Sequence, residues 1–278
     1  MNALMTGSVV LLGAIVGSFL NVCIHRLPRG LSVVRPRSAC PGCGRGIAWY
    51  DNVPLLSYLL LRGRCRGCGA PIALRYPLVE AATALLFALL LRSRGPTLWF
   101  LVEAAFGAAL IALILIDAEH QILPDAITLP GIALGLLAAP ALARFDPARG
   151  VTPLAAFLAA LQGAALGYAI PWSINAAYHG WQRLRSVPAA EREDGIGRGD
   201  FKLLAMIGAF LGTPILLFVL FAGSVAGALY GLMMMAWRGY GWKSKLPFGV
   251  FLGGAAIAAL FAGPSSVAWY LGLLGARP

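Results

Sequence analysis

Two aspartates stand next to apolar segments, and their positions suggest carboxylate chemistry. Asp117 ends the apolar run 104–116, and Asp200 closes the glycine-rich stretch 195–200 just before another apolar run. An ionisable group is costly next to hydrocarbon, so each aspartate is a candidate functional residue. Two acids brought together do not both ionise cheaply, so one holds a proton while the other acts as a base, as in aspartic proteases. The pair therefore predicts an acid pair that activates water.

Four of the five cysteines form a second chemical group. They occur as Cys40-Pro-Gly-Cys43 and Cys65-Arg-Gly-Cys68, with 21 residues between the two motifs. This spacing matches a tetrahedral zinc site, because each CxxC knuckle turns two thiolates toward one ion. Four thiolates leave no open position, so such a zinc would be structural and not the catalyst. A pair of disulfides is the alternative, and a reducing cytoplasm disfavours it.

The composition indicates that a lipid bilayer surrounds most of the chain. Of 278 residues, 59% are hydrophobic and only 12% are charged, whereas soluble domains carry about 25% charged residues. We therefore predict an all-α polytopic membrane protein with about eight transmembrane helices and a small zinc-knuckle domain. The expected spans are 4–25, 77–92, 97–116, 126–143, 151–174, 201–212, 214–237 and 247–262, with a last short piece at 265–275.

The basic residues predict how these spans are oriented. If the amino terminus lies outside, segments 26–75, 183–202 and 238–245 face the cytoplasm and hold 17 of the 22 Lys and Arg residues, as the positive-inside rule requires. Asp117 and Asp200 then lie on the cytoplasmic side. The formal charge of +11 is explained by a membrane-facing basic rim, without nucleic-acid binding. Run 4–25 has no basic segment before it, so we expect an uncleaved first helix.

The motifs together resemble one enzyme family. The chain is similar to the bifunctional prepilin leader peptidase/N-methyltransferases, which are GxGD-type aspartyl proteases of bacterial inner membranes. The resemblance rests on the order and spacing of Gly17-Ser-Phe-Leu-Asn-Val-Cys-Ile-His-Arg-Leu-Pro28, both CxxC knuckles, Leu61-Arg-Gly-Arg-Cys65, Arg75-Tyr-Pro-Leu-Val-Glu80, Ile116-Asp-Ala-Glu-His-Gln-Ile-Leu-Pro-Asp125 and Gly197-Arg-Gly-Asp-Phe-Lys-Leu-Leu204.

The resemblance implies two activities and assigns residues to one of them. It implies removal of the leader from type IV prepilins and from the pseudopilins of type II secretion, after a glycine, with Asp117 and Asp200 as the catalytic pair. N-methylation of the new terminus would follow, with S-adenosylmethionine as donor. The implied domains are a first helix (1–25), a cytoplasmic four-cysteine zinc domain associated with N-methylation (26–76) and a transmembrane peptidase domain (77–278).

Three alternatives stay open on the sequence. One is a peptidase without methyltransferase activity, whose zinc loop is a docking platform for substrate. Another is a noncatalytic assembly scaffold that holds a partner through the same loop. The third is a secondary transporter, since intramembrane acids beside broken helices also mark ion pathways.

Five further residues are candidates for supporting roles. Asp125 follows a proline and precedes an apolar run, so we expect a helix cap or a residue that supports the catalytic pair or positions substrate. The residues alone also leave it as an alternative catalytic acid. Glu80, early in its span, is expected to position substrate or pair with an arginine. Gly197 and Gly199 would let a peptide backbone approach Asp200 and let the loop move. Lys202 is expected to tune the charge of Asp200 or contact lipid phosphate.

Overall fold

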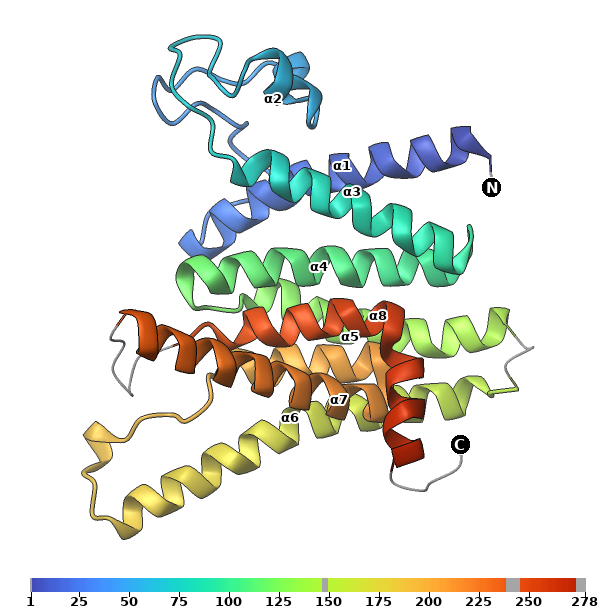
Figure 1. The fold of residues 1–278 in the computed structure, drawn as a ribbon, viewed down its shortest axis with the longest axis vertical. Coiled ribbons are helices and arrows are strands. Elements are labelled where there is room, and N and C mark those ends of the chain that lie inside the picture. The colour runs from blue at the N-terminus through green and yellow to red at the C-terminus, as the bar shows by residue number, and fades with distance from the viewer. Residues whose placement is uncertain (1, 147–149, 239–245, 274–278) are drawn as a thin grey trace. The chain divides into compact units, whose positions relative to one another are not determined.

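The computed structural model describes residues 2–146, 150–238 and 246–273, with side chains through residue 262. Within these residues the regular structure is helical, and the only β-pairing is two isolated bridges in the cysteine-rich loop. The predicted all-α class is confirmed (Figure 1). The chain divides into two compact units, Met1–Leu115 and Ile116–Pro278.

The first unit consists of a helix pair, the cysteine-rich loop and most of a third long helix. In it, α1 (Ala3–Arg26) packs along α3 (Arg75–Arg94). A Cβ atom on Gly17 would lie only 2.7 Å from the Cα of Glu80, and one on Gly13, a turn earlier, would lie 2.7 Å from the Cα of Ala84. These two glycines let the backbones of α1 and α3 meet closely. The remaining elements are η1 (Leu27–Arg29), η2 (Trp49–Asn52), α2 (Leu56–Leu60) and the greater part of α4 (Leu98–His120).

The second unit is a helix bundle centred on α7 (Arg198–Arg238), which Gly212 divides into two helical segments. It begins with the last turn of α4 and continues with α5 (Asp125–Phe145), α6 (Pro153–Leu184), η4 (Ala189–Glu191), α7 and α8 (Phe248–Leu273). Helices α5, α6 and α8 all pack against α7. A Cβ atom on Gly167 would lie 2.3 Å from the carbonyl oxygen of Leu204, so α6 and α7 touch backbone to backbone.

Among the residues that the structure describes, six helices are long and apolar enough to cross a membrane, and residues 248–262 of α8 form a shorter apolar helix. The protein is therefore a multi-pass membrane protein, and the count of eight spans stays a prediction. The boundary predicted between 212 and 214 is real, because Gly212 has a φ of 75° and interrupts α7. The last short piece predicted at 265–275 is helical up to Leu273, where α8 ends, and its final two residues lie outside the described residues.

Helix α6 is ten residues longer at its C-terminal end than the predicted run 151–174. Its 32 residues correspond to about 48 Å, more than the roughly 30 Å of a hydrocarbon core. Figure 1 shows this end of α6 projecting beyond α7, with the connecting segment returning to the start of α7. That polar end of α6 meets the glycine-rich segment that carries Asp200.

Candidate active site and metal site

Asp117 is held at the start of α8. It lies in the last turn of α4 and is buried, with 5% of its surface exposed. The backbone N–H of Val250, in the first turn of α8, donates a hydrogen bond of 3.2 Å to Oδ2 of Asp117. A Cβ atom on Gly249 would lie 2.9 Å from the same oxygen. The amino-terminal turn of α8 thus fixes the Asp117 carboxylate, and glycine leaves the space that it occupies.

Asp200 lies in the first turn of α7, which begins at Arg198. Its backbone N–H donates to the carbonyl oxygen of Gly197 at 3.0 Å, and a Cβ atom on Gly197 would lie 3.0 Å from Asp200 Oδ2. The aspartate is therefore the third helical residue rather than the cap of a helix that begins at Phe201. Its side chain turns back toward Gly197 and is 9% exposed.

The two aspartates lie close enough for their carboxylates to interact electrostatically. Leu123, from the segment between α4 and α5, fills the space beside them. A Cβ atom on Gly249 would lie 3.2 Å from Leu123 Cδ1, and one on Gly199 would lie 2.9 Å from Leu123 Cβ. The second unit therefore brings together the end of α4, the start of α7 and the start of α8 around two buried acids. Such a buried acid pair is equipped for general acid–base chemistry.

The glycines beside Asp200 serve close packing in this structure. Gly199 belongs to the first turn of α7, so the mobile loop predicted up to Asp200 ends at Gly197. Because no room exists for a Cβ atom between Gly199 and Leu123, a larger residue would push α7 away from the acid pair.

Asp125 does not cap its helix. Helix α5 begins at Asp125 with Pro124 in the cap position and no side-chain capping bond. The Asp125 carboxylate instead accepts a hydrogen bond of 2.5 Å from Lys202 Nζ, and its side chain is 56% exposed. The predicted capping role is therefore wrong, and the carboxylate is paired with Lys202 from a distant part of the chain. The ion pair connects the start of α5 to the first turn of α7, beside Asp200.

Glu80 belongs to the first unit and has no arginine partner among the described residues. Its Oε2 accepts a hydrogen bond of 2.8 Å from the backbone N–H of Leu55. Leu55 adopts a φ of 62° at the start of α2, so its amide points away from the helix ladder and needs an acceptor. Glu80, 8% exposed, fastens the cysteine-rich loop to α3.

The four predicted cysteines come together in the first unit. Their Sγ atoms all lie within 4.8 Å of one another, and those of Cys40 and Cys68 are 3.8 Å apart. A tetrahedral zinc with Zn–S bonds of about 2.3 Å requires sulfurs about 3.8 Å apart, so the spacing fits that ion. The cluster is a candidate metal site built from two knuckles.

The knuckles have the same backbone design. In the first, Cys40 N–H donates to Arg45 and Gly44 N–H to Cys40; in the second, Cys65 N–H donates to Ala70 and Gly69 N–H to Cys65. Gly44 and Gly69 have φ values of 70° and 71°, which side-chain-bearing residues rarely adopt. The repeated turn directs the thiols of both knuckles toward one another.

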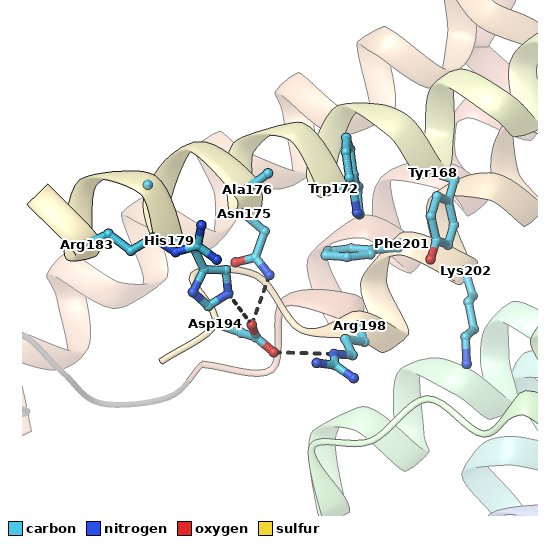
Figure 2. Close-up of a pocket in the computed structure, with 11 residues that line it drawn as sticks. Tyr168, Trp172, Asn175, Ala176, His179, Arg183, Asp194, Arg198, Phe201 and Lys202 are labelled. Carbon is cyan, nitrogen blue, oxygen red and sulfur yellow. Dashed lines mark hydrogen bonds and ion pairs between the residues drawn. The ribbon is translucent and has the colours of Figure 1, made fainter. Parts of the chain in front are cut away.

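A pocket of about 650 Å³ borders the segment that carries Asp200. It opens between the projecting end of α6 and the first turn of α7, as Figure 2 shows. Phe201 and Lys202, which directly follow Asp200, form part of its wall. The other lining side chains include Trp172, Asn175, His179, Asp194 and Arg198.

Sequence reasoning missed several residues of this site. Leu123, Gly249 and Val250 carry no titratable group, and only the Pro-Phe-Gly stretch before an apolar run marks a helix start there. Asn175 and Asp194 were also missed. Asn175 directly follows the predicted run 151–174, and Asp194 ends the charged stretch before Gly195.

Comparison with known proteins defines the family. Residues 11–93 match the bacterial peptidase A24 N-terminal domain, and residues 104–232 match the type IV leader peptidase family. No solved structure matches the chain significantly.

Three relatives carry the name prepilin leader peptidase/N-methyltransferase. The protein of Myxococcus xanthus is 44% identical over 81% of this chain and 61% of its own length. That of Aeromonas hydrophila is 38% identical over 95% of this chain and 92% of its own. That of Pseudomonas aeruginosa is 38% identical over 96% and 93%. The chain belongs to the type IV leader peptidase family, as its motifs predicted.

Proposed function

We propose that this protein removes the leader peptide of type IV prepilins by aspartyl catalysis and then N-methylates the new amino terminus. Membership in the family makes it a prepilin peptidase with N-methyltransferase activity. The observation that supports the catalytic assignment is the buried pair Asp117 and Asp200, whose carboxylates interact.

The pair would divide acid and base work in peptide hydrolysis. The ionised carboxylate takes a proton from water, whose oxygen attacks the scissile carbonyl carbon, and the protonated carboxyl donates to the carbonyl oxygen. The tetrahedral intermediate then collapses, the C–N bond breaks, and the amine leaves with a proton. The Val250 amide, 3.2 Å from Asp117, keeps one carboxylate in a fixed orientation throughout.

The acid pair is proposed to face the cytoplasm across the bacterial inner membrane. The distribution of Lys and Arg supports this topology. A prepilin with a basic leader and an apolar helix would then present its scissile bond at the depth of Asp117 and Asp200. Pseudopilins share these features and are proposed as further substrates. Reporter fusions after residues 60 and 190 should both give cytoplasmic signals; a periplasmic signal at either would reject the topology.

Zinc is proposed as the ion of the four-cysteine site, and residues 26–76 as the domain associated with methylation. Cys40, Cys43, Cys65 and Cys68 would hold the metal, which supplies a structural crosslink between the knuckles. S-adenosylmethionine is proposed as the methyl donor and supplies the methyl group when bound. The proposal of a methyl donor rests on the N-methyltransferase activity that the names of the relatives state.

A single assay separates the activities. Purified protein in lipid is incubated with a prepilin and S-adenosylmethionine, and product masses are measured for wild type, Asp117→Asn, Asp200→Asn and Asp125→Asn. We expect leader loss plus one methyl group for wild type. The changes at Asp117 and Asp200 should lower cleavage by about 10²- to 10⁴-fold, whereas Asp125→Asn, which removes an exposed ion pair, should lower it by less than about 5-fold.

Each other outcome has a clear meaning. Cleavage without added methyl mass would leave a peptidase whose zinc loop docks substrate. Unaltered cleavage by Asp117→Asn or Asp200→Asn would overturn the catalytic assignment. Absence of cleavage by folded wild-type protein would favour a scaffold or transporter.

A further inference from the structure

A buried amide on α6 holds the segment that leads to Asp200. Asn175 is 7% exposed, and its Oδ1 accepts the backbone N–H groups of Gly195 at 2.7 Å and Ile196 at 3.4 Å. Its Nδ2 donates to Asp194 Oδ1 at 3.1 Å. One side chain thus fixes three consecutive residues of the connecting segment, as Figure 2 shows for its bond to Asp194.

Two neighbours on the same face of α6 reinforce this attachment. His179, one turn after Asn175, lies 2.7 Å from Asp194 Oδ1 through its Nε2 atom. Gln182, 4% exposed, donates from Nε2 to the carbonyl oxygen of Glu193 at 2.9 Å. Spacings of four and three residues place all three side chains on one helix face. The C-terminal end of α6 is therefore a polar clamp on residues 193–196.

The clamp ends where the turn that carries Asp200 begins. Gly197 follows Ile196 directly, and its carbonyl oxygen accepts the Asp200 N–H at 3.0 Å. Gly195, Gly197 and Gly199 would otherwise give this segment great conformational freedom, because glycine has the largest backbone entropy to lose. Fixing residues 194–196 therefore fixes the point from which the first turn of α7 starts.

We propose that Asn175 is a positioning residue for the peptidase reaction, which acts by anchoring Gly195 and Ile196 so that Asp200 is presented to Asp117. This inference rests on the proposed function of the aspartate pair. The close packing of Gly167 against Leu204 locates the body of α7, one turn beyond Asp200. The approach of the chain to Asp200 depends on the clamp. Because a misplacement of 1 Å can cost about 10²-fold in rate, loss of the anchor should reduce kcat by about 10-fold and leave KM within about 2-fold.

The donor and acceptor atoms of the pair Asn175 and Asp194 allow a rescue experiment. Asn175→Ala removes all three bonds. Asn175→Asp keeps the acceptor for Gly195 but places two carboxylates together. The double change Asn175→Asp with Asp194→Asn exchanges donor and acceptor, and the second N–H of the new amide can donate to His179 Nε2 in its other tautomer. It therefore restores the bond and should recover most of the lost kcat. Ser173→Ala, on the same helix with a hydroxyl that bonds only within α6, is the matched control.

Two readouts distinguish positioning from general destabilisation. The first is kcat and KM for prepilin cleavage. The second is hydrogen–deuterium exchange of the peptide containing Gly195 and Ile196, measured without substrate. We expect faster exchange in Asn175→Ala, recovery in the double variant, and no change in Ser173→Ala.

The outcomes separate this inference from the proposed function. Wild-type kcat in Asn175→Ala, or a double variant no better than Asn175→Asp, would overturn the positioning role. If no variant, wild type included, cleaves prepilin, the proposed function fails. The exchange data then still decide whether Asn175 anchors the segment.

Discussion

Gly249 leaves the space that the Asp117 carboxylate occupies, and Gly249→Ala tests this directly. An alanine Cβ atom would lie 2.9 Å from Asp117 Oδ2 and 3.2 Å from its Cγ atom. Ordinary contacts begin at 3.4 Å, so the carboxylate or the start of α8 must move by about 0.5 Å. Since a misplacement of 1 Å can cost about 10²-fold in rate, we expect kcat to fall about 10-fold, equivalent to about 1.4 kcal/mol in the barrier.

The control for this prediction lies on the same helix. Nothing lies within 4 Å of a Cβ atom at Gly254, so Gly254→Ala gains helix propensity without a clash. Both variants should unfold at temperatures near that of wild type, and only Gly249→Ala should cleave prepilin slowly when kcat and KM are measured in lipid.

A second variant covers the case in which Gly249→Ala does not fold. Val250→Pro deletes the N–H donor to Asp117 Oδ2, and proline is tolerated in the first turn of a helix. A lost bond to a charged group is worth about 1.5–3 kcal/mol, so kcat should fall by at least about 10-fold. Wild-type kcat in whichever of the two variants folds would refute the idea that α8 orients Asp117.

Three further predictions concern other parts of the chain. Cys43→Ser should reduce bound zinc measured by atomic emission and abolish methylation, while cleavage continues; loss of both activities would instead make the metal site essential to the whole fold. Lys202→Asp alone should lower activity by up to about 5-fold, since the ion pair with Asp125 is partly exposed. Exchanging the two residues should restore that activity. No recovery would mean that the charge at 202 acts on substrate or lipid. A hydrogen bond from His179 holds the pKa of Asp194 below its usual range. The ionised Asp194 carboxylate therefore contributes fully to the stability of the folded protein above its pKa in the unfolded chain, about 3.9, and this contribution disappears as pH falls through the lower pKa of the folded state. Hydrogen exchange of residues 193–196, corrected for intrinsic rates, should therefore accelerate below about pH 4 in wild type, and an unchanged acid response in Asp194→Asn would contradict this assignment.

The features predicted well from the sequence are those that depend on neighbouring residues. Run 4–25 became α1 (Ala3–Arg26), and the break before 214 occurs at Gly212, because an apolar chain in lipid must satisfy its backbone hydrogen bonds within one helix. The CxxC spacing likewise predicted the thiol cluster, since each knuckle is a local turn. Family membership was predicted from the order of the motifs, which is a property of the sequence and does not depend on tertiary structure.

Other features were decided by contacts between distant segments. Asp117 meets the Val250 amide 133 residues later in the chain, and Lys202 meets Asp125 across 77 residues. Asp125 had the local pattern of a cap, yet Lys202 lies within its reach and takes the carboxylate. The end of α6 was predicted ten residues too early, because the polar side chains of Asn175 and Gln182 find their hydrogen-bond partners in residues 193–196, which follow later in the chain.

The sequence by itself therefore determined which chemical groups this protein has and that a membrane surrounds it. How those groups are placed against one another was decided by the tertiary structure. Hydropathy and motif spacing are properties of one segment, whereas the position of an acid relative to a backbone amide depends on how helices pack. In the second unit that packing is set by the backbone contact of Gly167 with Leu204 and by the space left at Gly249, neither of which is visible in any single segment.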